Sequence, residues 1–165
     1  MKKVCLLLLY MFNVSLLFSQ SLEDEQLKLK LLDFFNGIIS KDTTVDSLIN
    51  NYGNPDLVVN KKSGYLDDEM ITYSYENIGN FNFFYKKKKK KIYFWSVNLN
   101  SNFIDIINFP TTMDGVDNYF NTKFTRRISQ LNPGNIYLGY YGEFSINFIF
   151  KESDNKLYQI NWILH

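Results

Sequence analysis

The stretch FNGIISKDTTVD at residues 35–46 returns 68 positions later as FIDIINFPTTMD at residues 103–114. Aligned without gaps, residues 35–54 and 103–122 share seven identical positions, and several others pair apolar with apolar. A second ungapped match relates residues 71–99 to residues 136–164 with an offset of 65. Its lysine matches carry little weight, because any lysine would match a run of six. Two tandem copies of one small unit are therefore the predicted architecture.

Each copy opens with a predicted short helix. Thr44 is a suitable N-cap for the first helix, and Gly53 followed by Pro55 marks its end. Thr112 takes the place of Thr44 in the second copy, where the helix reaches about residue 121 without a Gly-x-Pro stop. The second helix should therefore end in a different turn.

A further helix is predicted before the repeat. Residues 22–36 carry apolar side chains at helical spacing, an acidic first turn and lysines later, which suits an amphipathic helix and its dipole. We expect this segment to lie outside the repeat, as an extra element that covers a face or an edge of the sheet.

After each helix the sequence predicts antiparallel strands. Aromatic and β-branched residues alternate in three segments of each copy, which are 71–76, 81–86, 92–99, 136–141, 144–150 and 157–164. Residues 57–60 and 123–129 are possible shorter leading strands. The predicted fold class is α+β, with two tandem helix-then-antiparallel-sheet repeats preceded by an N-terminal helix. One continuous sheet with the helices on one face is one form of this fold.

The start of the chain reads as a secretory signal. Lys2 and Lys3 precede an apolar run at residues 4–18 and a small residue at Ser19, which indicates cleavage after Ser19 or Gln20. An uncleaved anchor is the alternative, although the run is shorter than the roughly 20 residues that cross a bilayer. We expect an exported protein, periplasmic or secreted. The predicted organisation is a signal peptide at 1–20, the N-terminal helix at 21–40, repeat 1 at 35–100 and repeat 2 at 103–165.

Period-two alternation assigns the strand side chains to two faces. The face expected to meet the helices is apolar in both copies, and it includes Tyr93, Trp95 and Tyr158. The other face is polar with apolar islands, which are Phe84, Phe94, Tyr137, Tyr141, Ile149 and Ile163. Contiguous exposed aromatic side chains usually mark a contact surface. Cover by the N-terminal helix is the alternative explanation for them.

The repeat carries a family resemblance. Each copy has the pattern Thr-Thr-φ-Asp-x-φ-x-Asn-x-aromatic, where φ is an apolar residue, followed by aromatic-rich strands. This resembles the small helix-then-sheet domain of the SmpA/OmlA outer-membrane lipoproteins, and its tandem duplication is similar to the β-lactamase-inhibitor-protein family. The resemblance implies a non-catalytic, exported protein-binding module with a sheet face as its contact surface. The acceptor cysteine of the lipoproteins and the second Gly-x-Pro are missing.

The composition argues against an enzyme. His165 is the only histidine, so a His-based triad and a multi-His metal site are excluded. Cys5 is the only cysteine and lies in the predicted signal, so the mature chain has no thiol nucleophile, disulfide or Cys-ligated metal. The carboxylates in or beside strands, Glu76 and Glu143, are not counterparts in the repeat and offer no paired acid and base. We predict no cofactor and no bound metal.

A run of six lysines would ordinarily suggest a nucleic-acid patch. Its repeat counterpart at residues 151–156 is a mixed-charge turn, which predicts a solvated hairpin connection instead. The alternative is weak contact with an anionic surface through Lys86, Lys87, Lys88, Lys89, Lys90 and Lys91. Without Lys2 and Lys3 the chain has 16 basic and 17 acidic residues, which gives no basis for a nucleic-acid partner.

Two functions therefore remain open, and an enzyme using carboxylates, Tyr, Ser or Lys is a third. The first is an exported non-catalytic protein-binding module of the cell envelope, such as an inhibitor, an immunity-like factor or an assembly accessory. It would dock a partner on its sheet face through Glu76, Phe84, Phe94, Tyr137, Tyr141 and Ile149. The alternative is a carrier of a small apolar ligand in a cavity between sheet and N-terminal helix, lined by Phe84, Phe94, Tyr137 and Tyr141.

Overall fold

The computed structural model describes residues 25–39, 42–62, 68–128 and 132–165. The chain divides at residue 40, and the parts before and after this point are described separately. Before it, residues 25–36 form a helix within the predicted range. The predicted signal peptide lies outside the described residues. Within the described residues, no helix is long and apolar enough to span a bilayer.

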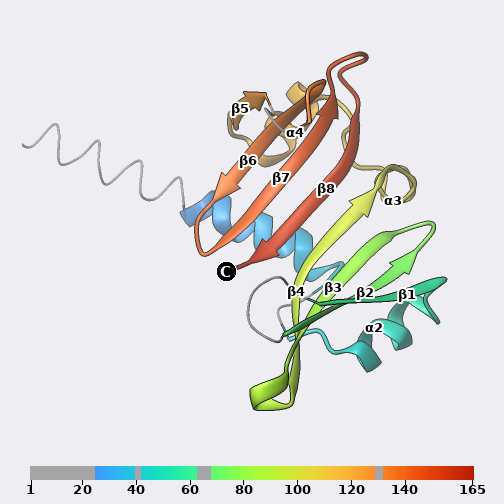
Figure 1. Cartoon of the computed structure of the whole chain (residues 1–165). Helices are drawn as coiled ribbons and strands as arrows, with labels where there is room; N and C mark the ends of the chain where they lie inside the picture. Colours follow the sequence, from blue (N-terminus) through green and yellow to red (C-terminus); the bar gives the residue numbers. More distant parts are fainter. Residues whose placement is uncertain (1–24, 40–41, 63–67, 129–131) are drawn as a thin grey trace, which may run out of the picture. The chain divides into compact units, whose positions relative to one another are not determined.

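The second part contains an eight-stranded antiparallel sheet with short helices. Its elements follow in this order along the chain (Figure 1): α2 (Val45–Tyr52), β1 (Leu57–Lys62), β2 (Glu69–Tyr75), β3 (Gly79–Lys86), the 3₁₀ helix η1 (Lys87–Lys89), β4 (Lys91–Asn100), α3 (Ser101–Ile106), α4 (Met113–Phe120), β5 (Thr125–Ile128), β6 (Asn135–Tyr141), β7 (Phe144–Lys151) and β8 (Leu157–Leu164).

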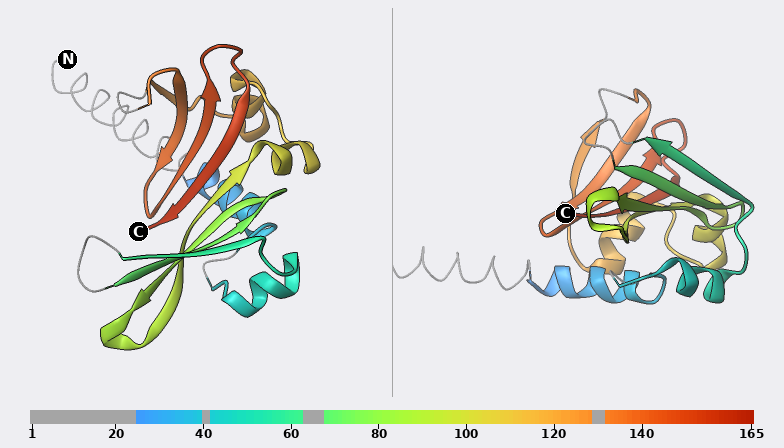
Figure 2. Two further views of the ribbon diagram at one scale, coloured as in Figure 1. Left: turned by 45° about the vertical axis from the view of Figure 1, so that its right-hand side comes forward. Right: turned by 60° about the horizontal axis from the view of Figure 1, so that its bottom comes forward.

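The strand order is β1-β2-β3-β4-β8-β7-β6-β5, so the last strands of the two copies lie side by side at the centre. Figure 2 shows teal α2, yellow α3 and light orange α4 on the same side of the twisted sheet. We call the opposite side of the sheet the open face. The predicted α+β fold, with tandem copies in one continuous sheet and helices on one face, is confirmed.

The seam between the copies has the symmetry of the repeat. Val97 on β4 lies opposite Trp162 on β8, which is the same position 65 residues later. On either side of this pair, Ser96 faces Ile163 and Asn98 faces Asn161. The 65-residue offset exchanges these two flanking pairs. The two copies are therefore related by a pseudo-two-fold axis that passes between Val97 and Trp162.

The two repeat helices begin alike and end differently, as predicted. Thr44 and Ser47 form a reciprocal capping box at α2, and the side chain of Thr112 accepts a hydrogen bond from the Gly115 backbone N–H at α4. The first helix ends at Gly53 with φ of 81° and ψ of −168°, whereas the second ends at Asn121 in the left-handed region, with φ of 53° and ψ of 46°.

Aromatic side chains fill the layer between these helices and the sheet. The ring of Tyr52 on α2 lies 5.5 Å from that of Phe81 on β3. In the second copy the Phe120 ring on α4 lies 5.6 Å from that of Phe148 on β7. Phe81, Phe120 and Phe148 are buried, so each copy rests its helix on the apolar face that the alternation predicts.

A β-bulge in β4 reverses part of the predicted face assignment. Phe83 pairs with Phe94 and Asn82 pairs with Ser96, which leaves Trp95 as an extra residue. Phe94 is therefore on the helix face, where it is 3% exposed and its ring contacts that of Trp162. The predicted placement of Phe94 on the open face is wrong. Trp95, which was predicted to meet the helices, instead lies against Phe84 on the open face.

The same bulge moves Tyr93, and a second one moves Tyr158. Tyr93 pairs with Phe84 and so lies on the open face instead of the predicted helix face. In the second copy Ile149 pairs with Gln159 and Phe150 with Leu157, which leaves Tyr158 as the extra residue of β8. The ammonium of Lys151, which is on the open face by register, lies over the Tyr158 ring, so the predicted placement of Tyr158 toward the helices is also wrong.

One detail of the repeat differs from the sequence alignment. Tyr73 lies opposite Phe81 and Tyr140 opposite Ile146, so the first hairpin strand is offset by 67 and not by 65. Because the two offsets differ by an even number, the side chains of this strand stay on their predicted face.

Candidate functional site

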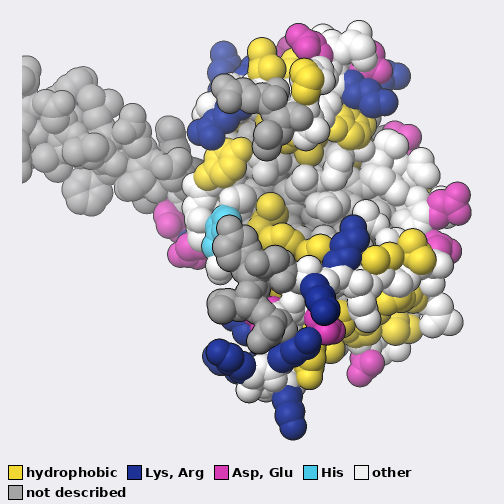
Figure 3. Space-filling view, in the orientation of Figure 1, with side chains coloured by type: hydrophobic (Ala, Val, Ile, Leu, Met, Phe, Trp, Pro, Cys, Tyr) yellow, Lys and Arg dark blue, Asp and Glu magenta, His cyan; other side chains and the backbone are white. Residues whose placement is uncertain are grey.

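The centre of the open face is a row of asparagines. Asn80 on β3 pairs with Asn98 on β4, Asn98 with Asn161 on β8, and Asn161 with Asn147 on β7. We call these four residues the asparagine row. In the space-filling view the middle of this face is white, which marks uncharged polar groups and backbone, and the lysines, arginines and acids lie around it (Figure 3).

A second polar row runs beside the asparagine row in the first copy. The Thr72 hydroxyl donates to Asn82 Oδ1 at 2.8 Å, and Asn82 Nδ2 donates to the Ser96 hydroxyl at 3.0 Å. Asn82 and Ser96 are 7% and 2% exposed, so these bonds satisfy polar groups that would otherwise be costly to bury. This chain of hydrogen bonds fixes the surface of β2, β3 and β4.

In the second copy a tyrosine lies flat over a glycine. The Tyr141 phenol donates to Asn147 Oδ1 at 2.6 Å, and the guanidinium of Arg127 lies over the Tyr141 ring at 4.8 Å. A Cβ at Gly139 would come within 2.6 Å of that ring, so only glycine leaves room for it. The arrangement presents Tyr141, 49% exposed, as a rigid edge to solvent.

Each copy also places a lysine over a tyrosine at equivalent positions. The Lys86 ammonium lies 4.9 Å from the centre of the Tyr93 ring, and that of Lys151 lies 5.6 Å from the Tyr158 ring. A hydrogen bond to Tyr93 and the interaction of their charges raise the pKa of Lys86. Burial, and then the neighbouring Tyr137, raise the pKa of the Tyr158 phenol. Two aromatic clusters thus frame the polar centre: Phe84, Tyr93 and Trp95 in one copy, and Tyr137 and Tyr158 in the other.

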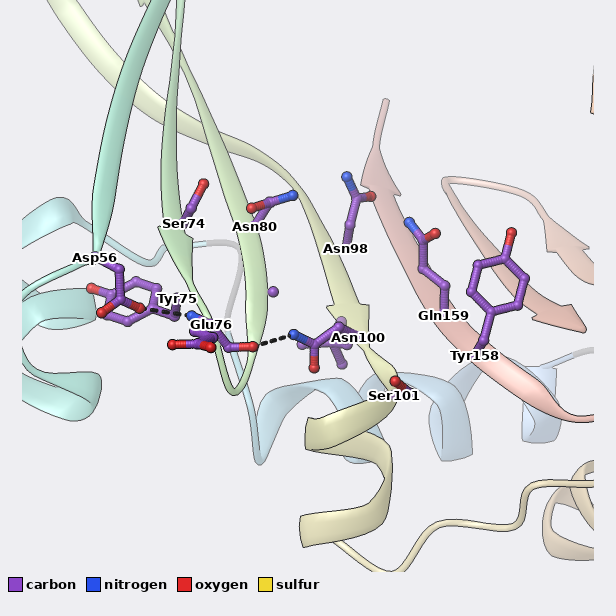
Figure 4. A pocket seen from close by; sticks show the side chains of 12 residues that line it. Asp56, Ser74, Tyr75, Glu76, Asn80, Asn98, Asn100, Ser101, Tyr158 and Gln159 are labelled. Atoms are coloured by element: carbon purple, nitrogen blue, oxygen red, sulfur yellow. Dashed lines mark hydrogen bonds between the residues drawn. The ribbon is translucent and has the colours of Figure 1, made fainter.

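A groove of about 490 Å³ opens at one end of this face. Figure 4 shows Ser74, Asn80, Asn98 and Gln159 side by side across β2, β3, β4 and β8, with Tyr158 at one end. Asp56, Glu76 and Asn100 form its rim. Asn100 Nδ2 donates to the Glu76 carbonyl at 2.7 Å, and the Glu76 backbone N–H donates to Asp56 Oδ2 at 2.7 Å. The rim is thereby held in place across the turn.

The structure places the predicted contact residues in different environments. Phe84, Tyr137 and Tyr141 lie on the open face, half-buried or exposed. Ile149 belongs to the same face by register but is only 3% exposed, so it supports the surface from below. Glu76 is exposed and follows the end of β2, where it lines the groove. Phe94 belongs to the core and cannot contact a partner.

The lysine run occupies the connection between β3 and β4, as its repeat counterpart predicts. Lys86 ends β3, η1 follows, Lys90 takes a left-handed conformation with φ of 47°, and Lys91 begins β4. Lys87 pairs with Glu69 at 3.0 Å. Contact of these lysines with an anionic surface stays a prediction.

Other candidate sites have structural explanations. Among the described residues there is no group of three His, Cys, Asp or Glu that could hold a metal ion. A hollow beside α4 is lined by Asp114 and Asp117, and Arg126 pairs with both at 3.1 Å and 3.7 Å. His165 Nε2 lies 2.6 Å from the Ser145 hydroxyl, but Ser145 is buried on β7, which leaves a substrate little access to it.

Sequence reasoning missed several residues of this face. The alternation predicts Tyr93, Trp95 and Tyr158 on the face that meets the helices, and it does not include Asn80 in a strand. The sequence does carry a signal for the two cation–π pairs, because Lys86 matches Lys151 and Tyr93 matches Tyr158 in the repeat.

Comparison of the chain with known proteins shows a similarity to a solved structure. No family model matches it. No curated protein matches it. Among solved structures it is similar to a DUF4309 family protein, YjgB, from Bacillus subtilis subsp. subtilis str. 168, with 12% sequence identity, coverage of 78% of this chain and 83% of that chain, and a TM-score of 0.49. The resemblance to the SmpA/OmlA and β-lactamase-inhibitor-protein families stays a prediction.

Proposed function

We propose that this chain is an exported, non-catalytic binding module that docks an envelope or secreted protein on the open face of its sheet. The observation that carries the proposal is the division of the sheet: the helices α2, α3 and α4 lie on one side, and the other side combines an uncharged polar centre with aromatic clusters. Tyrosine, tryptophan and arginine are the residues that most often dominate the binding energy of protein interfaces.

The charges around this face indicate the kind of partner. Lys86, Arg127 and Lys151 lie on the open face by register, and each holds its cation over a tyrosine ring. A cation held in this way is presented with less loss of side-chain freedom on binding. We infer a partner whose contact patch carries acidic side chains facing these three positions.

The experiment is site-specific photo-crosslinking in the producing cells. A photoreactive residue at Asn161 or Tyr141 should give one protein adduct, whereas the same residue at Asn118 on α4 should give none. Once that protein is identified, Arg127→Ala with Lys151→Ala should weaken its binding and flatten the salt dependence. Adducts of equal yield from Asn118, or a salt dependence that does not change, would contradict docking on the open face.

The carrier alternative is not favoured by any observation. Its four lining residues are divided between the two faces, since Phe94 is in the core while Phe84, Tyr137 and Tyr141 are on the open face. The groove that does open on this face is lined mainly by amides and hydroxyls, which suit a polar ligand.

A further inference from the structure

The groove at the end of the open face has the size of a small-ligand site. Its volume of about 490 Å³ falls within the roughly 300–1,000 Å³ typical of ligand pockets. Its floor is built from uncharged polar side chains on four neighbouring strands: Ser74, Asn80, Asn98 and Gln159. Strand register places Ser74 opposite Asn80 and Asn80 opposite Asn98. Gln159 lies opposite Asn100, two residues further along β4.

The amides of the floor have hydrogen-bonding capacity to spare. Within the part of the chain that the structure describes, no hydrogen bond involves the side chains of Asn80 or Asn98, and Asn98 is half-buried. Gln159 uses one Nε2 hydrogen on Asn161 Oδ1 at 2.7 Å, which leaves its oxygen and second hydrogen. Asn80 is exposed and the other two amides are half-buried, so water can satisfy them in the free protein. A ligand that both donates and accepts would take the place of that water.

The charge of the lining narrows the ligand class. The charged residues that line the groove, Asp56 and Glu76, are both acidic and lie at the end away from Tyr158, so an anion would be repelled at that end. An apolar ligand would strip water from the amides and leave them unpaired. Hydroxyl groups each donate and accept, which matches the amides of Asn80, Asn98 and Gln159.

One end of the groove offers an aromatic surface. Tyr158 lies there because of the bulge in β8, and the Lys151 ammonium over its ring restrains it. A tyrosine ring combines a flat apolar body with a polar tip. A sugar ring has apolar C–H faces and polar hydroxyl edges, so it can stack on such a ring while its hydroxyls reach the amides.

From these observations we propose that the groove binds a neutral sugar residue, with Asn98 and Gln159 bonding its hydroxyls and Tyr158 packing against its ring. The proposal rests on the binding role of the open face and names the chemistry recognised at one end of it. The sugar can belong to a free polysaccharide or to a glycan carried by the docked protein, and the experiment separates these sources.

The test is calorimetric titration of the full chain with neutral hexasaccharides of glucose, galactose, mannose and N-acetylglucosamine. At least one should bind, and Asn98→Ala and Gln159→Ala should each weaken it by about tenfold, the effect of losing one or two hydrogen bonds. Asn118→Ala, at an exposed position on α4, lies outside the groove and is the matched control, with sugar affinity expected to remain unchanged. Circular dichroism of each variant confirms that it is folded.

A second arm uses the same sugars attached to a carrier protein. Equal affinity for free and attached sugar indicates a polysaccharide ligand, and tighter binding that is lost on enzymatic removal of the glycan indicates a glycoprotein. The proposal is overturned if none of the sugars binds at about 1 mM in either form. It is also overturned if Asn98→Ala and Gln159→Ala bind like the wild type, or if an oligosaccharide of uronic acids binds more tightly than every neutral one. If the wild-type chain binds no sugar but still docks its protein partner on the open face, this proposal is rejected and the proposed function stands.

Discussion

Val97 and Trp162 lie opposite each other on the two central strands, and they are the same position in the two copies of the repeat. Both are buried, at 0% and 1% exposure. The Trp162 ring also contacts Phe94, 5.8 Å away, and Phe144, 6.4 Å away, so it joins the cores of both copies. The seam is therefore a continuous part of the core, and the two copies should unfold together.

The bulge in β4 predicts that alanine substitution destabilises the protein by different amounts at two neighbouring aromatic residues. Phe94→Ala should lower the free energy of unfolding by about 3–5 kcal/mol, because it leaves a cavity beside Phe83 and Trp162. Trp95→Ala should cost about 1–2 kcal/mol, because Trp95 is half-buried and packs mainly on Phe84. Urea denaturation of both variants checks this, and a larger loss for Trp95→Ala would contradict the bulged register.

The surroundings of Gly79 predict that adding even a methyl side chain at this position destabilises the protein. The φ of Gly79 is +134°, and a Cβ there would overlap the backbone oxygen of Asn98. Gly79→Ala should therefore destabilise the protein by more than about 3 kcal/mol. Gly134→Ala is the matched control, since Gly134 has φ of +93° with nothing within 4 Å of the added carbon, and its cost should be about 1–2 kcal/mol. Thermal unfolding that ranks the two variants in the reverse order would refute the close contact.

The ring of Tyr141 lies over Gly139, which predicts that substitutions at these two positions are energetically coupled. Gly139→Ala should displace the Tyr141 ring, break the hydrogen bond to Asn147 and cost about 0.5–1.5 kcal/mol. In a Tyr141→Ala background the same change should be neutral or stabilising, because alanine in a strand is favoured over glycine by about 0.5–1 kcal/mol. A double-mutant cycle measures this coupling, and additive effects would show that the ring does not lie over Gly139.

Tyrosines in the first copy predict loss of stability at alkaline pH. Burial is the main cause that raises the pKa of Tyr52, Tyr73 and Tyr75 above 10.0. The folded protein then holds these protons when the unfolded chain has lost them, so their stabilisation is present below about pH 10 and declines as pH rises through the folded pKa values. Urea denaturation from about pH 8 to about pH 11 should show this decline.

The matched variant for this decline is Tyr73→Phe. It removes a phenol whose pKa is raised by burial and keeps the ring that contacts Phe83. Its stability should fall less steeply with pH than that of the wild type. An unchanged slope would mean that Tyr73 does not contribute to the alkaline transition.

The repeat made most of the fold predictable. Two copies with the same strand pattern need only one new contact to form a single sheet, and the helix caps at Thr44 and Thr112 are local signals that tertiary packing did not override. The bulges were not predictable from alternation. Tyr93, Phe94 and Trp95 are all aromatic, so either phase of the strand places an aromatic ring on each face, and only the pairing with β3 selects one.

The polar centre of the open face was recognisable only in part. The alternation assigned Asn98, Asn147 and Asn161 to the polar face, but nothing in the chain order shows that they are neighbours. Their adjacency depends on the pairing of β4 with β8 across the seam, which joins positions more than 60 residues apart. A groove formed by that pairing cannot be derived from either copy alone.

The symmetric pairing of β4 with β8 has a consequence for how such a chain arises. A contact in which the same surface meets itself across a two-fold axis is what joins the subunits of a homodimer. Here both partners belong to one polypeptide, so an association that would depend on protein concentration is now intramolecular. The fusion also frees the two halves to diverge. One half carries Thr72, Asn82 and Ser96 as a hydrogen-bonded row, while the other carries Gly139 and the tyrosine above it, a difference that two identical subunits could not have.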